Sequence, residues 1–545
     1  MNIGIVGACG RGGSFKEGCD ALEGVRILAV CDTNAEGLEA AAARLGAAEK
    51  YTDYQTMLDR SAIQAVIIGT PMHFHVPQAV AALQRGLHVL SEVPAGVSMD
   101  ECRQLVAACL ASKAVYMMAE NLTYLRPNVV IREMVRRGLF GAPYYAEGEY
   151  IHELKALNER TPWRRRWQTG VNGVTYPTHS LGPILQWMGG DRVASVCCAG
   201  SGHHYSDPRG AQYENEDSCV MPCRMASGGL VKVRVDMLSD RPHAQMNYQL
   251  QGTDGCYESA RADGEAGRVW LRSRNRGKDA WTPLAELEEE FLPQFWKDGL
   301  SRASQAGHGG GDYFEVLDFV DAARGLRPPP VGIHEAMDMT LPGLASQTSI
   351  AEGGRWVAVP DSRTWTGEPR KGQLHMVVPE ELLDRWPAPR LPEGYEMRLF
   401  RDSDLADYIA LMHKRDLGGE WTPQRVSAVR DSVLPGGFFV VIHRATGRLA
   451  ASAMAIHRPQ GLHPEGGELG WLAADPEHKG KGLGRAVVTA VVGRMIRAGY
   501  RRIYLQTDDF RLPALKVYLS VGFQPLMHSD DMPARWAAVR QRLGM

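Results

Sequence analysis

The sequence predicts an α/β protein with a doubly wound parallel sheet, a second domain with an open sheet, and a separate C-terminal α/β domain. The first prediction rests on residues 1–120, where short apolar runs alternate with helical periods. The second rests on residues 144–272, which contain strand-like runs and few helical patterns. The third rests on a proline-rich break, after which a new alternating pattern begins.

Composition limits the function classes. At 545 residues the chain is long enough for about three or four domains, and its 44% hydrophobic content excludes a mainly disordered protein. A net charge of −2 provides no basic field for nucleic acid or an anionic membrane. No apolar run reaches the roughly 18 residues of a membrane span, and the strand-like pattern of the first residues leads us to expect no signal peptide. All ten cysteines precede residue 257 without a metal or disulfide pattern, which favours free thiols in the cytoplasm.

The first domain is expected over residues 1–122. Apolar runs predict its strands at residues 3–6, 25–31, 65–69, 87–90 and 115–118. Alanine- and leucine-rich periods at residues 35–45 and 77–85 predict helices between the strands. This βαβ alternation is typical of a Rossmann-type parallel sheet.

A glycine-rich turn follows the first predicted strand and opens a helix. Glycines allow a tight turn and let backbone N–H groups approach a pyrophosphate at the helix N-terminus. The spacing departs from G-x-G-x-x-G because Cys9 stands where the second glycine is expected. Asp32 ends the second strand, where a carboxylate can bind the ribose 2′-hydroxyl and repel a 2′-phosphate. We therefore expect NAD, not NADP, to be bound by Asp32 together with Gly7, Cys9, Gly10, Arg11 and Gly12.

The turn, residues 69–75 (GTPMHFH) and residues 92–94 (EVP) together resemble the Gfo/Idh/MocA oxidoreductases, across about residues 1–365. Most dehydrogenases of that group carry Glu-Lys-Pro, and the lysine transfers protons near the nicotinamide. Val93 occupies that position here and cannot exchange a proton. The resemblance implies further cofactor contacts from Thr70, Pro71, His73, His75, Glu92 and Asn121.

Five segments resemble one branch of that group, the NAD-dependent glycoside hydrolases typified by α-N-acetylgalactosaminidase, which also has valine in Glu-x-Pro. They are residues 117–121, 146–152, 163–165, 176–179 and 307–310. The branch oxidises the sugar at C3 transiently, eliminates the C1 group, adds water and returns the hydride, so it needs several acid–base groups. The resemblance implies that Tyr150 and His179 transfer protons, with Tyr176 and His152 beside them as further catalytic candidates. Glu120 and Arg164 would orient substrate hydroxyls.

The second domain, of Gfo/Idh/MocA substrate-domain type, is expected over residues 123–365, a proline-rich linker over 366–393, and a last domain over 394–545. In the last domain an apolar strand ends in a Gly/Lys turn that opens a helix, which suits a pyrophosphate. Residues 470–485 and 504–523 resemble the GNAT acetyltransferases. The resemblance implies that Tyr518 protonates the leaving thiolate, Glu468 is a candidate base, and acetyl-CoA contacts Leu472, Ala474, Lys479, Gly480, Lys481, Gly482, Gly484 and Arg485.

The sequence thus predicts a bifunctional enzyme. One half would be an NAD-dependent sugar oxidoreductase or redox-neutral glycoside hydrolase with tightly held NAD, and the other an acetyl-CoA-dependent N-acetyltransferase. Two alternatives stay open: a sugar dehydrogenase that releases NADH at each turnover, and a protein in which one half only binds or serves as a scaffold. The expected partners are a sugar or glycoside, an amine acceptor and further copies of the chain joined through the open sheet. No metal, nucleic acid or membrane is expected.

Overall fold

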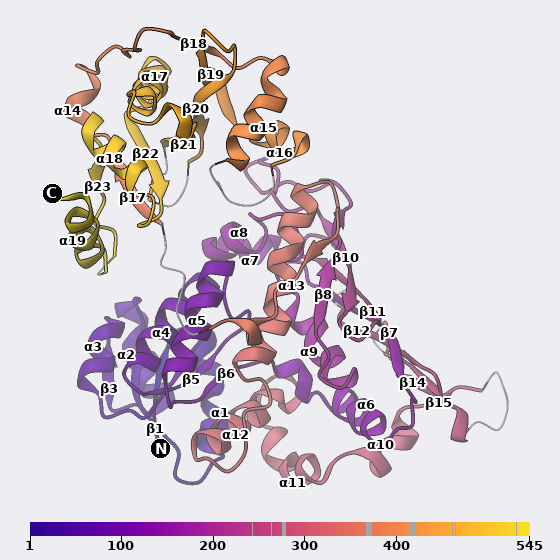
Figure 1. The fold of residues 1–545 in the computed structure, drawn as a ribbon. Coiled ribbons are helices and arrows are strands. Elements are labelled where there is room, and N and C mark those ends of the chain that lie inside the picture. Colours follow the sequence, from indigo (N-terminus) through magenta and orange to yellow (C-terminus); the bar gives the residue numbers. More distant parts are fainter. Residues whose placement is uncertain are drawn as a thin grey trace. The chain divides into compact units, whose positions relative to one another are not determined.

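The computed structural model divides into two compact units, Met1–Arg370 and Lys371–Met545. It describes residues 1–241, 244–262, 264–274, 280–366, 373–414, 421–430, 432–459, 462–463, 465–529 and 531–545, with the side chains of 244–246 left out. Figure 1 colours the first unit from indigo to pink and the second from orange to yellow. Within the described ranges, no helix is long and apolar enough to cross a membrane.

The first sheet confirms the doubly wound prediction. Its six parallel strands have the order β3-β2-β1-β4-β5-β6 and run over Asn2–Val6 (β1), Arg26–Cys31 (β2), Glu49–Tyr51 (β3), Ala65–Ile68 (β4), His88–Ser91 (β5) and Tyr116–Met118 (β6). The helices of this part are α1 (Lys16–Asp20), α2 (Ala35–Leu45), α3 (Tyr54–Arg60), α4 (His75–Gln84) and α5 (Met99–Ala111). The strand order reverses between β1 and β4, and in such sheets ligands bind beyond the carboxyl ends of the strands at that point.

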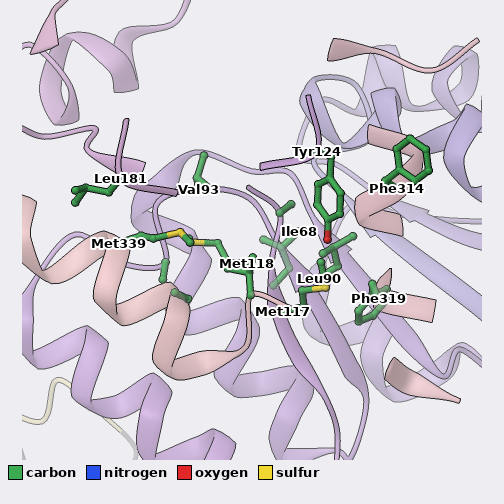
Figure 2. Packing of buried hydrophobic residues seen from close by; sticks show 14 of the residues in the cluster. Ile68, Leu90, Val93, Met117, Met118, Tyr124, Leu181, Phe314, Phe319 and Met339 are labelled. Atoms are coloured by element: carbon green, nitrogen blue, oxygen red, sulfur yellow. The ribbon is translucent and has the colours of Figure 1, made fainter. Parts of the chain in front are cut away.

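An apolar cluster lies at this end of the sheet. Ile68 of β4, Leu90 of β5 and Met118 of β6 are fully buried, as expected where helices cover a parallel sheet. Figure 2 shows these side chains with Val93 and Met339 in the same cluster. Val93 is 4% exposed, so this residue of the Glu-x-Pro segment contributes packing.

The second sheet has the order β15-β14-β13-β12-β7-β11-β10-β8-β16, with β9 paired to β10. Its strands are β7 (Pro143–Ile151), β8 (Val193–Val196), β9 (Ala199–Gly200), β10 (Ser218–Met225), β11 (Leu230–Asp236), β12 (Ala244–Gly252), β13 (Gly255–Glu258), β14 (Arg268–Leu271), β15 (Thr282–Pro283) and β16 (Val357–Ala358). Its helices are α6 (Arg126–Arg136), α7 (Lys155–Arg160), α8 (Pro162–Trp167), α9 (Thr178–Trp187), α10 (Ala285–Phe291), α11 (Gln294–Ala303), α12 (Gly311–Ala323) and α13 (Ile333–Ala351). Helix α9 packs on β7, while α12 and α13 return to the first sheet's elements α1, α5 and β6. Both sheets therefore belong to one unit.

The second unit has one sheet of order β18-β19-β20-β21-β22-β17-β23. Its strands are β17 (Leu374–Val377), β18 (Tyr395–Leu399), β19 (Val433–His443), β20 (Leu449–His457), β21 (Gly466–Ala474), β22 (Arg502–Thr507) and β23 (Gln524–Pro525). Its helices are α14 (Glu380–Leu383), α15 (Leu405–His413), α16 (Pro423–Arg430), α17 (Leu483–Arg497), α18 (Leu512–Val521) and α19 (Met532–Leu543). Helices α17 and α18 share one apolar cluster, whereas α15 and α16 belong to another.

The structure differs from the linker predicted over residues 366–393. Within that range β17 pairs with β22 and β23, and Leu374 and Met376 are fully buried in the core of the second unit. The Trp386 indole donates a hydrogen bond to the carbonyl oxygen of Thr489 in α17 at 2.9 Å. The range also contains the short helix α14, and the prolines at positions 387, 389 and 392 follow both elements. A four-residue strand and a four-residue helix carry little sequence signal beside them. Residues 367–372 lie outside the described residues.

Candidate active sites

The glycine turn after β1 is packed tightly against the end of β4. Gly7 has a φ of +79°, and a Cβ on it would lie 2.5 Å from the carbonyl oxygen of Gly69. A Cβ on Gly12 would lie 2.9 Å from the carbonyl oxygen of Gly7. At Gly10 the nearest atom would be 3.8 Å away, so this position leaves space beside the turn. Gly7 and Gly12 are therefore required by close packing of the backbone, whereas Gly10 leaves room for a ligand beside the turn.

Asp32 is held beside this turn by two backbone N–H groups. Cys9 donates to one of its oxygens at 2.9 Å, and Asn34 donates to the other at 3.0 Å. Each carboxylate oxygen keeps a further lone pair, which can accept a ribose hydroxyl. The Cys9 N–H is used by Asp32 rather than offered to a phosphate. Burial raises the pKa of the Cys9 thiol, and the Asp32 charge adds to the effect.

Arg11 links the turn to two distant segments. Its Nε donates to Glu92 at 2.6 Å, and its Nη1 and Nη2 donate to the two oxygens of Asp312 in α12 at 2.9 and 3.0 Å. Asp312 also accepts from the Asn121 amide at 3.2 Å and contacts Nδ1 of His308 at 2.9 Å. Burial raises the pKa of Asp312, but hydrogen bonds from His308 and Arg11 outweigh it and hold that pKa well below its usual range.

Glu315, one turn further along α12, lies under this network. Its side chain is fully buried, and its Oε1 lies 3.7 Å from Nη2 of Arg11. Neither of its oxygens has a hydrogen-bond partner among the described residues. Burial and the neighbouring Asp312 carboxylate raise its pKa well above the usual range.

Four predicted acid–base side chains meet at the end of β7. The Tyr150 hydroxyl lies 2.7 Å from Nδ1 of His152. The ring of Tyr150 lies 5.3 Å from that of Tyr176 and 5.4 Å from that of His179, which is 5.1 Å from Tyr176. Burial raises the pKa of Tyr176 well above its ordinary value.

Glu120 fixes the orientation of His179. The Nδ1 atom of His179 lies 2.8 Å from Oε1 of Glu120, and a carboxylate only accepts at neutral pH, so Nδ1 carries the proton. The Nε2 atom of His179 is then the basic nitrogen. Glu120 is 0% exposed and its carboxylate contacts His179, while its expected contact with substrate hydroxyls stays a prediction.

The predicted loop residues take different positions. His75 is 1% exposed, and its ring nitrogens lie 2.8 Å from the carbonyl oxygen of Pro94 and 2.9 Å from that of Thr70, so it joins two loops. Burial lowers the pKa of His75. His73 stacks on Trp167 with ring centres 5.3 Å apart. The buried His75 therefore holds the loop in place, and contact of Thr70, Pro71, His73 and His75 with the cofactor stays a prediction.

Arg164 lies on the helix that follows this sheet edge. Its guanidinium lies 4.2 Å from the centre of the Trp163 ring. Burial lowers the pKa of Arg164, while Tyr176, Tyr150 and Glu92 oppose that shift. These same neighbours place the guanidinium within electrostatic reach of the acid–base cluster.

The second unit contains a separated pair of parallel strands. The ladder between β21 and β22 ends at the pair Glu468 and Tyr504, although β21 continues to Ala474 and β22 to Thr507. Beyond it, β21 pairs with β20 and β22 with β17. The register of β21 shifts around Trp471, whose φ is +54°. The two strands thus separate directly before the predicted acetyl-CoA turn, and Leu472 and Ala474 lie on the separated part of β21.

That turn is exposed and open. Gly480 and Gly482 have φ values of +82° and +77°, and a Cβ on either would meet nothing within 4 Å. Gly482 is the N-cap of α17, so the first-turn N–H groups of a long helix face this space. The exposed basic side chains around it are those of Lys479, Lys481 and Arg485, and Gly484 lies in the first turn of α17.

The two acyl-transfer candidates are both buried. Glu468 on β21 and Tyr518 on α18 are each 6% exposed. Burial raises the pKa of Glu468, although Arg458, 3.1 Å from its Oε2, opposes the shift. Burial also raises the pKa of Tyr518, and the Glu468 charge contributes to that rise.

Comparison with known proteins identifies the first unit. The family model for the oxidoreductase family with NAD-binding Rossmann fold matches residues 1–120, and that for the glycosyl hydrolase 109 C-terminal domain matches residues 124–366. A glycosyl hydrolase family 109 protein from Saccharopolyspora erythraea is 30% identical over 390 residues, which cover 66% of this chain and 83% of that protein. The chain belongs to the glycosyl hydrolase 109 family. An alpha-N-acetylgalactosaminidase from Shewanella oneidensis is 28% identical over 394 residues, 66% of this chain and 84% of that protein.

Solved structures and a third family model complete the comparison. Levoglucosan dehydrogenase in complex with NADH and L-sorbose matches with a TM-score of 0.56 and 20% identity, over 67% of this chain and all of that one, which shows the fold alone. The acetyltransferase (GNAT) family model matches residues 406–523. The chain is therefore an enzyme in which a glycosyl hydrolase 109 unit, Met1–Arg370, is fused to an acetyltransferase unit, Lys371–Met545.

The sequence predicted the side chains around Tyr150 but not the hydrogen-bond network that joins Arg11 to distant segments of the glycosyl hydrolase 109 unit. Asp312 and Glu315 were not predicted, although Asp312 directly follows the glycine-rich residues 307–311. The glycines of that segment were the available signal in the sequence, because they allow a left-handed backbone. In the structure His308, Gly309 and Gly310 all have positive φ. In the described part of the chain, no group of three or more His, Cys, Asp or Glu side chains could hold a metal ion.

Proposed function

We propose that the glycosyl hydrolase 109 unit hydrolyses a glycoside of an N-acetylated amino sugar without net redox change, and that the acetyltransferase unit transfers an acetyl group from acetyl-CoA to an amine. The single observation that carries the first proposal is the cluster of Tyr150, His152, Tyr176 and His179 in a unit whose Glu-x-Pro residue is an apolar, buried Val93. The name of the Shewanella oneidensis relative supports the substrate class.

The residues of the β1 turn fit a dinucleotide. Gly10 leaves space beside the turn, and Asp32 keeps lone pairs for the ribose hydroxyls. NAD+ bound there would supply the acceptor for the hydride of the sugar C3, and its reduced form the source of the hydride that goes back. Arg11, Glu92, Asn121 and Asp312 hold the surrounding loops in place.

The acid–base cluster supplies the proton transfers. Tyr150, paired with His152, takes the proton of the C3 hydroxyl as that carbon becomes a ketone. The ketone acidifies C2, and Nε2 of His179, held by Glu120, removes the C2 proton. Tyr176 keeps its proton because burial raises its pKa, so it donates to the leaving oxygen as the C1–O bond breaks. Water then adds at C1 and gives a proton to Tyr176, while His179 returns its proton to C2 and Tyr150 returns its proton to the C3 oxygen.

The acetyltransferase unit has residues for one direct transfer. Glu468 accepts the proton of the amine as its nitrogen bonds to the thioester carbonyl carbon. The C–S bond breaks, and Tyr518 donates a proton to the departing thiolate. The separated strands β21 and β22 and the open turn at Gly480 and Gly482 support acetyl-CoA as the donor.

The first proposal is tested with p-nitrophenyl α-N-acetylgalactosaminide in deuterated buffer. We expect release of nitrophenol, no accumulation of NADH by absorbance, and one deuterium at C2 of the product by mass spectrometry. NADH formed in proportion to product would instead support a sugar dehydrogenase. Absence of bound NAD after denaturation of the purified chain would favour a silent first unit.

The second proposal is tested by calorimetry of the intact chain with acetyl-CoA. We expect binding at one site per chain, and its absence would favour a silent second unit. Association of chains through the open sheet around β7 stays a prediction, which sedimentation of the intact protein would check.

A further inference from the structure

Strand β17 belongs to the acetyltransferase sheet but precedes the residues that match the acetyltransferase family, 406–523. It pairs antiparallel with β22 on one side and with β23 on the other. Leu374 and Met376 point into the cluster that contains α17 and α18. Because successive side chains of a strand alternate between faces, His375 and Val377 point to the opposite face.

That opposite face also carries the proposed base. Glu468 pairs with Tyr504, and Tyr504 pairs with Val377, so these three side chains form one row across the sheet. His375 pairs with Gln506 in the next row, on the side where β21 and β22 separate. His375 therefore lies beside the separated strands on the same face as Glu468.

A directed chain of hydrogen bonds fixes the tautomer of His375. Arg502 can only donate, and its Nε lies 3.2 Å from Nδ1 of His463. The proton of a neutral His463 is then on Nε2, which lies 3.0 Å from Nδ1 of His375. Nδ1 of His375 accepts this proton, so Nε2 of a neutral His375 carries the remaining N–H and is a donor.

Burial keeps both rings neutral. His463 is fully buried and stacks on Tyr504 with ring centres 3.8 Å apart. Burial and then the nearby His528 lower the pKa of His375 to about 4. Burial, then Arg502, His375 and His528 lower the pKa of His463 to about 4. The chain of donors is therefore intact near neutral pH.

We propose that His375 completes the acyl-acceptor site by donating a hydrogen bond from Nε2 to an oxygen atom of the amine substrate. The proposal rests on the acetyltransferase function proposed above. Glu468 and His375 lie two strands apart across the sheet, and His375 is displaced by two residues along the strand direction. The spacing between strands and the rise per residue together place their Cα atoms about 12 Å apart. Because both side chains leave the sheet on the same face and stand roughly perpendicular to it, their ends are separated by a similar distance. With about 3 Å for each hydrogen bond, roughly 6 Å remains between the amine nitrogen and the acceptor oxygen. That span favours a ring-sized amino sugar over a short amino alcohol.

The experiment uses the intact chain with acetyl-CoA, and measures CoA release with a thiol reagent. The probes are galactosamine, glucosamine and hexylamine, which has no oxygen. We expect H375A to raise the KM for a hexosamine by roughly 3- to 10-fold, the effect of one neutral hydrogen bond. The KM values for hexylamine and acetyl-CoA should not change. H375Q keeps a donor and should restore part of the hexosamine affinity.

Val377→Ala is the matched control, because it shortens a side chain on the same strand and face without removing a donor. Its KM values should equal those of the unchanged chain. Equal effects of H375A on hexosamine and hexylamine, or no turnover of either hexosamine while acetyl-CoA is bound, would overturn the assignment of His375. Failure of acetyl-CoA to bind the unchanged chain would overturn the acetyltransferase proposal itself.

Discussion

Two glycine turns open helices in this protein, and they use glycine for different reasons. In the glycosyl hydrolase 109 unit, Gly7 and Gly12 are needed because neighbouring backbone atoms would lie within 3 Å of a Cβ. In the acetyltransferase unit, Gly480 and Gly482 have empty surroundings and are needed for their positive φ. The comparison shows that a glycine motif can serve the fold or the ligand, and that only the packing around it separates the two roles.

The basic residues of the two turns differ in the same way. Arg11 donates to Glu92 and Asp312 within its own unit. Lys479 and Lys481 are exposed beside an open turn. The first turn therefore depends on distant parts of its unit, whereas the second is available to an anion from solvent.

The largest expected effect is on the packed turn. Gly69→Ala places a Cβ 2.4 Å from the backbone nitrogen of Gly12, and neither backbone can move freely. We expect a loss of about 3–5 kcal/mol in the free energy of unfolding of the first unit, together with loss of bound NAD. Differential scanning calorimetry of the intact chain measures both transitions, and that of the second unit should not shift. Gly86→Ala, at an open positive-φ turn, is the control, and an equal loss there would contradict the packing argument.

A substitution in the open turn at Gly482 should abolish acetyl-CoA binding without unfolding the second unit. Gly482→Asp brings a side chain and a negative charge to the N-terminus of α17, so acetyl-CoA binding should become undetectable by calorimetry. Gly499→Asp is the matched control, because Gly499 follows the other end of α17 with a φ of +90° and equally open surroundings. If both variants lose binding, strain rather than contact with the pyrophosphate is responsible.

The two turns also show which features of the site could be predicted from the sequence. Both were predicted because glycine spacing after a strand is a local signal. Tyr150 and His152 were predicted from a local signal too, since they lie two residues apart at the end of β7. The partners of Arg11 were not predicted, because Asp312 is 301 residues away and only the fold brings them together. The contact of Glu120 with His179 was not predicted either, since only the fold shows which side chain a buried carboxylate meets.

The second unit was predicted in type but not in extent. The apolar pattern of β21 and α17 and the motif around Gly482 identified an acetyltransferase. Strand β17 was missed because four residues carry little periodicity and prolines follow them. Its place in the sheet is set by β22 and β23, which lie far along the chain.

Removal of the Tyr518 hydroxyl should affect the activity of the acetyltransferase unit alone. Tyr518→Phe removes a hydroxyl from a buried side chain, so acetyl-CoA binding should stay nearly the same. The rate of acetyl transfer should fall by about 10²–10⁴, as is typical when a general acid is lost. Stopped-flow measurement of CoA release gives this rate, and nitrophenol release by the first unit serves as the internal control. A fall in both activities would show that the units are coupled.

Asp32 tests the cofactor choice of the packed turn. Its carboxylate is held by the backbone of Cys9 and Asn34, and a hydrogen bond to a charged group contributes about 1.5–3 kcal/mol. Asp32→Ala should therefore weaken NAD binding by roughly 10- to 150-fold, measured by fluorescence titration of the NAD-free chain. The unchanged chain should prefer NAD to NADP. Equal affinity for the two dinucleotides would contradict the assignment.

The smallest expected effect is a difference in acid sensitivity between the units. Burial lowers the pKa values of His375 and His463 to about 4, whereas the unfolded chain has histidine pKa values of about 6.5. The unfolded state therefore binds more protons between these values, so the stability that these two histidines contribute is complete above pH 6.5 and falls as the pH drops toward 4. In the first unit His73, His75 and His88 behave in the same direction. That unit spans residues 1–370 and the second only 371–545, so the same loss of free energy lowers the unfolding temperature of the first unit less. We expect the unfolding temperature of the second unit to decrease more steeply between pH 6.5 and 4 than that of the first. His463→Gln should flatten this decrease, and an unchanged slope would show that other groups cause it.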